Sequence, residues 1–209
     1  MCGAGQGLTV GAWVRRTGWS WDPGTIIETP WFKLRVYSTN VWRFELNLED
    51  GEEGCVDEAF FSDFWMQSEL LVDDGMDKLN ISTMNTWSYV AATWDGHTAA
   101  VFVNGHRVVQ KAYHLEGPRP LESGCPATGQ IGYIRVNDSE TGEPVYVGAD
   151  ASIRHLSVWG DVLDSEAQLD LAQGLLPNAS LVAYWPLDEG SGQVAHDLSG
   201  HGHDGQYLE

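Results

Sequence analysis

The stretch from Thr86 to Val108 constrains the fold of this chain more than any other, and it reads TWSYVAATWDGHTAAVFVNGHRV. Residues 87–94 and 98–103 are β-branched, aromatic or small, and each run is short enough to be one strand. Asp95-Gly96 follows the first run and Asn104-Gly105 the second. Such dipeptides supply the positive φ angles that two-residue hairpin turns require. The pattern predicts three successive antiparallel strands of a β-sandwich.

Alternating apolar residues predict further strands on both sides of this stretch. Leu8, Val10, Ala12 and Val14 would share one face of a strand over 8–14. The other predicted strands cover 25–27, 32–37, 41–48, 106–112, 130–136, 145–148, 153–159 and 181–187. In the strand over 153–159, strict alternation places Ile153, Ser157 and Trp159 on one face. At 209 residues with 43% hydrophobic residues, the chain fits a single all-β domain.

One helix is predicted between the last two of these strands. Asp164 or Ser165 would cap it, with Ser165 and Gln168 forming a capping box. Leu169 and Ala172 would share one helix face, and Gly174 would end the helix. A single short helix within many strands keeps the fold class all-β.

The charge of the chain excludes several classes of partner. Thirty acidic residues against 11 basic ones give a net charge of -19, which disfavours nucleic acids and anionic membrane surfaces. No apolar run approaches the roughly 20 residues of a membrane span. The N-terminus lacks the features of a secretory leader, so we expect either a fragment or a chain whose leader has been removed.

Acidic residues are concentrated between Glu49 and Asp77, where there are 11 and no Lys or Arg. We interpret about 49–84 as an insertion in the domain, partly held by its aromatic residues. It could be a solvated acidic surface, a docking loop or a cation-binding rim.

Cysteines and glycosylation motifs bear on the compartment. Cys55 and Cys125 could form a disulfide, with Cys2 free or paired outside the chain, and three unpaired thiols are the alternative. Asn80, Asn137 and Asn178 each begin an Asn-x-Ser motif for N-glycosylation. These features favour an extracellular or secretory-lumen location.

Several segments together resemble the laminin-G-like jelly roll of the concanavalin A-like superfamily. They are LTVGAWVR, the central hairpins, the strand and helix IRHLSVWGDVLDSEAQL, and LVAYWPLDEGSG with DLSGHGHDG. The resemblance implies two stacked antiparallel sheets that bind glycans or proteins outside the cell, often with a structural Ca²⁺. The YWPLDEGSG strand normally comes first in this family and comes last here. The domain is therefore either circularly permuted, which nearby termini allow, or cut from a tandem array.

The loop from Asp197 to Asp204 is a candidate calcium site. Asp197, Ser199 and Asp204 offer oxygen ligands, and Asp150 could add another. Family members often have an Asp-Glu pair on the late strand, where this chain has Arg154 and His155. The alternative is a Gly-rich turn held by Asx hydrogen bonds.

Aromatic residues outside the clear strands are candidate sugar-binding groups. Flat rings with polar neighbours suit pyranose faces, and the candidates are Trp19, Trp21, Trp31, Trp42 and Tyr37. The alternative is that these rings fill the core, as we expect for Trp13, Trp87, Trp94, Trp159 and Trp185.

An enzyme is the distant alternative. Retaining glucanases of this fold carry Glu-x-Asp-x-Glu on one strand, and Glu45, Asn47 and Glu49 resemble it imperfectly. We therefore predict no catalytic residues and a non-catalytic recognition or assembly module. Its partner would be a glycan or a protein, and the module would belong to a larger chain or assembly. The alternative is a structural subunit that docks through its acidic insertion.

Overall fold

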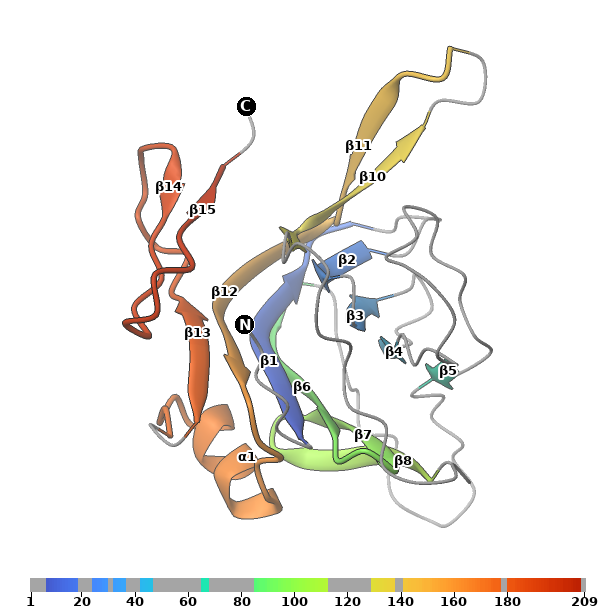
Figure 1. The fold of residues 1–209 in the computed structure, drawn as a ribbon, viewed down its shortest axis with the longest axis vertical. Helices are drawn as coiled ribbons and strands as arrows, with labels where there is room; N and C mark the ends of the chain where they lie inside the picture. The colour runs from blue at the N-terminus through green and yellow to red at the C-terminus, as the bar shows by residue number, and fades with distance from the viewer. Residues whose placement is uncertain are drawn as a thin grey trace.

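The computed structural model describes residues 7–18, 24–29, 32–36, 42–46, 65–67, 85–112, 129–137, 141–177 and 180–207. Within that part, two antiparallel sheets face each other (Figure 1). The six-stranded sheet has the order β13-β12-β1-β6-β7-β8, with bounds Leu181–Trp185, Ala151–Trp159, Leu8–Arg16, Trp87–Trp94, Thr98–Val103 and His106–Ala112. The five-stranded sheet has the order β5-β4-β3-β2-β9, with bounds Trp65–Gln67, Trp42–Leu46, Phe32–Val36, Gly24–Glu28 and Gln130–Ile131. The predicted all-β sandwich is confirmed.

Three smaller elements lie outside the two sheets. Strands β10 (Tyr133–Asn137) and β11 (Pro144–Gly148) form a hairpin that projects from the sandwich (Figure 1). Strands β14 (Val194–Ala195) and β15 (Gly205–Gln206) form a second, short hairpin near the C-terminus. Helix α1 (Ser165–Ala172) lies at the end of the six-stranded sheet where β12 ends (Figure 1).

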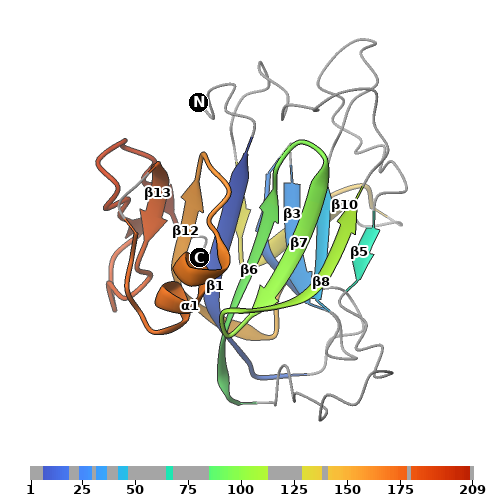
Figure 2. The same ribbon diagram turned by 90° about the horizontal axis from the view of Figure 1, so that it is seen from below.

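The central hairpins form as their sequence predicts, with one difference in turn geometry. Strands β6, β7 and β8 are successive and antiparallel, and Figure 2 shows them side by side with β1. Asn104 and Gly105 have φ angles of 50° and 81°, as a two-residue turn requires. At the first corner only Gly96 has a positive φ, and the Asp95 carboxylate instead accepts hydrogen bonds from the backbone N–H groups of His97 and Thr98.

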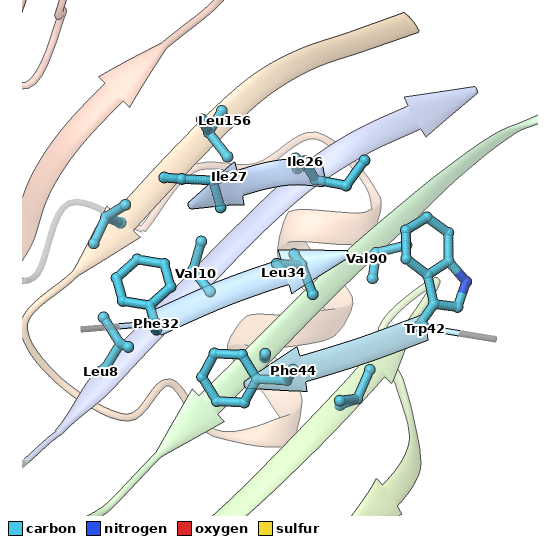
Figure 3. Packing of buried hydrophobic residues seen from close by; sticks show 14 of the residues in the cluster. Leu8, Val10, Ile26, Ile27, Phe32, Leu34, Trp42, Phe44, Val90 and Leu156 are labelled. Carbon is cyan, nitrogen blue, oxygen red and sulfur yellow. The ribbon is translucent and has the colours of Figure 1, made fainter. Parts of the chain in front are cut away.

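The main core lies between the two sheets (Figure 3). The predicted face of β1 is confirmed, because its four apolar residues are all at most 2% exposed. The five-stranded sheet contributes alternate residues from β3 and β4, such as Leu34 and Phe44. The largest wholly buried side chains of this core are those of two tryptophans, Trp42 on β4 and Trp94 on β6.

The predicted face assignment of β12 is wrong beyond Arg154. His155 has a φ of 51°, and the pairing with β1 shifts register between Gly11 and Trp13. This bulge inserts one extra residue into the strand. Leu156 and Val158 therefore join Ile153 in the core between the sheets, whereas Trp159 packs in a second cluster on the outer face.

Helix α1 covers that second cluster. Its N-cap is Asp164, whose side chain accepts a hydrogen bond from the backbone N–H of Ala167, and Gly174 follows its C-terminus with a φ of 83°. The predicted capping box is wrong, since the Gln168 side chain is buried and donates to the Leu163 carbonyl. Of the two residues predicted to share a helix face, Ala172 packs against this cluster, whereas Leu169 is 38% exposed and Leu171 is the buried leucine.

Gly105 explains why the helix can pack so close to the sheet. A Cβ atom at Gly105 would lie 2.8 Å from the Cα atom of Leu169, and its φ of 81° is also unfavourable for other residues. The turn is fixed further by Asn104, whose side chain accepts a hydrogen bond from the backbone N–H of Tyr89. One Asn-Gly turn therefore both closes a hairpin and seats the helix.

The C-terminal segment adds a strand to the edge of the six-stranded sheet. Strand β13 pairs antiparallel with β12, and its Ala183 is 3% exposed in the core between the sheets. Strand β12 separates β13 from the first strand, β1. Circular permutation and origin in a tandem array both stay predictions.

Most of the predicted acidic insertion lies outside the described residues. Within it the structure describes β5, which pairs with β4 at the edge of the five-stranded sheet. The single-domain assignment over 1–209 remains a prediction. Among the residues described, no helix has both the length and the apolar character needed to cross a bilayer.

Candidate functional site: an aromatic and arginine band

The outer face of the six-stranded sheet is divided into two regions. At one end, α1 and the residues before it cover the cluster around Trp159 and Tyr89. This cover is fixed by Thr9, whose hydroxyl donates to the Asp161 carbonyl and accepts from the Leu163 N–H. At the other end lie aromatic and arginine side chains on four adjacent strands, all half-buried except the exposed His155. We call these residues the outer-face band: Trp13, Arg15, Trp87, Arg154, His155 and Tyr184.

Strand register brings the band together. Arg15 on β1 is the register partner of both Ser152 on β12 and Trp87 on β6. In the next row that faces outward, Trp13 on β1 is the register partner of Arg154 and Tyr89. Side chains at such cross-strand positions are close enough to interact directly. Each row thus places an arginine next to a tryptophan on the neighbouring strand.

Both arginines stack on tryptophan rings. The guanidinium carbon of Arg154 lies 4.2 Å from the centroid of the Trp87 ring and 5.7 Å from that of Trp13. The guanidinium carbon of Arg15 lies 5.2 Å from the Trp87 centroid. Cation–π contacts of this kind contribute roughly 0.5–2 kcal/mol each, more as water is excluded. Trp87 is therefore the contact that holds the two arginines in place.

The arginines of the band have no acidic partner among the described residues. Arg15 donates one hydrogen bond, of 3.2 Å from Nη2 to the Ser152 hydroxyl. The Nε atoms of Arg15 and Arg154 are buried, and neither has a hydrogen-bond partner within the described ranges. Elsewhere in the described part, Arg35 and Lys33 both contact the Glu28 carboxylate, at 2.9 and 2.6 Å. The band is thus a positive site in an acidic protein.

His155 and Tyr184 extend the band onto β13. Their rings stack with centroids 6.1 Å apart, and His155 Nδ1 lies 2.7 Å from the Tyr184 hydroxyl. Burial, followed by the positive charge of Arg154, lowers the pKa of His155. The neutral imidazole is therefore favoured at neutral pH, and the arginines carry the charge of the band.

Sequence reasoning placed two members of the band incorrectly. Trp13 and Trp87 were predicted to fill the core, and both lie half-buried on the outer face beneath arginines, with Trp13 also packed against the second cluster. Trp94 and Trp159 are buried as predicted, at 1% and 0% exposed. The sequence does place Arg15 on the same strand face as Trp13, because side chains two residues apart in a strand point to the same side of the sheet. The position of Arg154 beside these two residues depends on the bulge at His155 and on the strand order, which the sequence alone does not show.

The structure tests one of the five predicted sugar-binding residues. Trp42 is 0% exposed in the core between the sheets, so its ring is not available to stack on a sugar. Trp19, Trp21, Trp31 and Tyr37 lie outside the described residues and remain predictions.

The loop from Asp197 to Asp204 is closed by its own hydrogen bonds. One carboxylate oxygen of Asp197 accepts from the N–H groups of Tyr184 and Ser199, and the other accepts from the Ser199 hydroxyl and the His203 N–H. Partial burial acts to raise the pKa of Asp197, but these hydrogen bonds outweigh it and lower the pKa from 3.8 to about 2. Asp204 in turn accepts from the Asp197 N–H.

This donor set does not fit a calcium ion well. Both oxygens of Asp197 already accept hydrogen bonds within the loop or from β13. Across the part of the chain that the structure describes, no three Asp, Glu, His or Cys side chains are grouped to hold a metal. Asp150 forms a turn at the start of β12, where its carbonyl accepts from Thr17 and Gly18. Calcium binding remains a prediction that calorimetric titration with CaCl₂ would test.

We expect Asp197→Asn to lower the free energy of unfolding by about 1–2 kcal/mol at neutral pH, because donors to Oδ2 lose their acceptor. A lowered carboxyl pKa stabilises the fold fully above its unfolded value and loses that effect as pH falls through the folded value. The difference between wild type and variant should therefore be full above about pH 4 and shrink toward about pH 2. Thermal unfolding across this range measures it. Asp188→Asn, an exposed neighbour, is the control, and an equal loss in both variants would contradict the expectation.

The remaining predicted sites are largely outside the described part. Cys55, Cys125, Asn80 and Asn178 all lie outside it, and Asn137 is the last residue of β10, opposite Pro144. Of the glucanase-like residues, Glu45 lies on β4 opposite Lys33 and Trp65, while Asn47 and Glu49 are not described. The disulfide, the glycosylation sites and the absence of catalytic residues stay predictions.

The two facing antiparallel sheets, with a jelly-roll sandwich core, define a lectin-like class of protein. The sequence matches the family model of the concanavalin A-like lectin/glucanases superfamily over residues 2–167. The chain belongs to this superfamily, which confirms the resemblance found in the sequence. The matched region ends within α1, so β13 and the following loop lie beyond it.

Solved structures with a similar fold include two described as binding proteins. A protein of Bacteroides ovatus, assigned to carbohydrate binding by inference, is 19% identical with a TM-score of 0.57, and the match covers 94% of this chain and 50% of that one. The binding domain of botulinum neurotoxin DC, in complex with rat synaptotagmin II, is 14% identical with a TM-score of 0.51, over 84% of this chain and 38% of that one. This chain thus spans half or less of either structure. Curated proteins gave no significant sequence match.

Proposed function

We propose that this chain is a non-catalytic recognition module that binds glycans at the outer-face band. The observation that carries the proposal is the band itself: aromatic rings and hydrogen-bond donors held together on the outer face of the six-stranded sheet. Sugar-binding sites combine these same groups, apolar surface with a few fixed polar atoms. The superfamily and the carbohydrate-binding description of the Bacteroides protein support this reading.

Binding at the band would involve the arginines first. Because guanidinium groups stack on Trp87 and Trp13, a sugar would meet their N–H groups and the edges of the rings. Ser152 and Tyr184 would add hydroxyl groups beside them. None of these contacts requires a nucleophile or a pair of carboxylates, which is consistent with binding rather than hydrolysis.

A glycan array tests the proposal. We expect wild-type protein to bind a defined set of glycans, and Trp87→Ala to weaken that binding at least about tenfold, since it removes the ring that supports both arginines. Trp19→Ala and Trp21→Ala are the comparison, because those residues were predicted from the sequence. Binding that survives Trp87→Ala but is lost in the loop variants would move the site to residues 19–21. No glycan binding by correctly folded wild type would refute the function.

A second function rests on the acidic stretch from Glu49 to Asp77, which has 11 acidic residues and no basic ones. It would make the chain a structural subunit that docks onto a basic protein through this insertion. A stable complex lost on neutralising Glu52, Glu53, Asp57 and Glu58 would favour that role. In either role we place the module outside the cell, within a larger chain or assembly, in keeping with the lectin-like fold and three glycosylation motifs.

A further inference from the structure

We propose that the glycan bound at the outer-face band carries a carboxylate group, and that Arg15 and Arg154 bind that carboxylate. The ligand class is therefore an acidic glycan, one that contains uronic or sialic acid residues. This inference rests on the proposed function, and it goes further by naming the chemistry that the ligand must present.

Neither Arg15 nor Arg154 has an acidic partner among the residues that the structure describes. With 30 acidic residues and 11 basic ones in the chain, the protein has ample carboxylates to pair each arginine. Arg35 is paired in this way with Glu28, at 2.9 Å. Arg15 and Arg154 instead face only aromatic rings and the Ser152 hydroxyl in the described part. A partly buried guanidinium without an anion is costly unless a partner arrives from outside.

The two guanidinium groups are already positioned by one shared tryptophan ring. Trp87 contacts both, at 5.2 Å for Arg15 and 4.2 Å for Arg154. A stacked arginine has little side-chain entropy left to lose on binding. Because each fork matches a planar carboxylate in a bidentate pair, such a site selects carboxylates by geometry as well as charge.

The charges around the band also favour an anionic ligand. The described groups facing His155 and Tyr184 are Arg154 and Asp188, and the lowered pKa of His155 leaves that ring neutral at neutral pH. The two arginines are therefore the main positive charges of the band. In a chain of net charge -19, an anionic ligand would be repelled from most surfaces, so this local reversal of sign also sets where such a ligand binds.

The experiment compares acidic glycans with matched neutral ones. Intact protein is first applied to an array holding uronic-acid, sialic-acid and neutral glycans. The strongest binder is then measured by calorimetry before and after its carboxyl groups are reduced to hydroxymethyl groups. We expect reduction to weaken binding at least tenfold, and Arg15→Gln and Arg154→Gln each to weaken binding of the acidic form by about tenfold or more. Arg107→Gln, an exposed arginine on β8, should change affinity less than about twofold. Thermal unfolding confirms that each variant is folded.

The outcomes separate this inference from the proposed function. Suppose that neutral glycans bind, that Trp87→Ala abolishes this binding, and that Arg15→Gln and Arg154→Gln have no effect on it. That result would overturn the acidic-ligand inference and leave the recognition function standing. No glycan bound at all would overturn both. Binding of polyglutamate or of a 49–77 peptide in preference to glycans, lost in the same arginine variants, would replace the glycan with an acidic polypeptide and overturn the inference.

Discussion

Replacement of Trp42 by alanine is expected to lower the free energy of unfolding by about 3–5 kcal/mol, the usual cost of removing a large buried aromatic ring. Trp42 is one of the wholly buried tryptophans of the described part and packs among Leu34, Phe44 and Val90 between the two sheets (Figure 3). For a domain of this size, that loss corresponds to a fall in Tm of roughly 10 °C. Chemical and thermal unfolding of wild type and variant measure it directly.

The control for this substitution is Leu175→Ala, because Leu175 is 57% exposed. Surface substitutions of this kind usually change stability by less than about 0.5 kcal/mol. The comparison also decides between the two roles considered for Trp42. A variant that keeps its stability but loses glycan binding would show that the ring is exposed and that the core assignment is wrong.

The second large effect is expected at Ala183, where we predict that aspartate costs more than about 3 kcal/mol. Ala183 lies on β13 and is 3% exposed in the same core as Val158. A carboxylate at this position would be buried without a partner, which is among the most destabilising of single changes. Loss of cooperative unfolding, or insolubility, would be the extreme form of this result.

Val194→Asp is the matched control for Ala183→Asp, since Val194 lies in the same C-terminal segment on β14 and is 36% exposed. We expect little change from it in thermal unfolding. Equal, small effects of both substitutions would mean that β13 does not pack into the sandwich. The family match ends at residue 167. Such equal effects would contradict our conclusion that residues beyond this point complete the fold.

The fold followed from the sequence because its strands carry strong local signals. Asn104-Gly105 specified a hairpin whose two φ angles are both positive, and alternation in β1 identified the buried face correctly. The predictions of buried faces and helix caps were wrong where a residue departs from the conformation or contact that its local sequence pattern predicts. The left-handed conformation of His155 shifted the faces of β12, and the burial of Gln168 replaced a capping box by a tertiary contact.

The candidate site could not be predicted in the same way, because no local pattern encodes it. Trp13, Trp87 and Arg154 lie far apart in the sequence and meet only through strand order and register. Aromatic residues within strands are usually core, which is why Trp13 and Trp87 were assigned there. The feature that distinguishes them is the pair of arginines without acidic partners, and its recognition requires the structure.

The most direct test of the recognition surface is the NMR response of the tryptophan indole N–H groups to a bound glycan. The chain has ten tryptophans, and single Trp→Phe variants assign their signals. We predict that the strongest binder from the array shifts the signals of Trp13 and Trp87 and leaves those of buried Trp94 and Trp159 unchanged. Shifts confined to Trp19, Trp21 or Trp31, with Trp13 and Trp87 unaffected, would contradict glycan binding at the outer-face band.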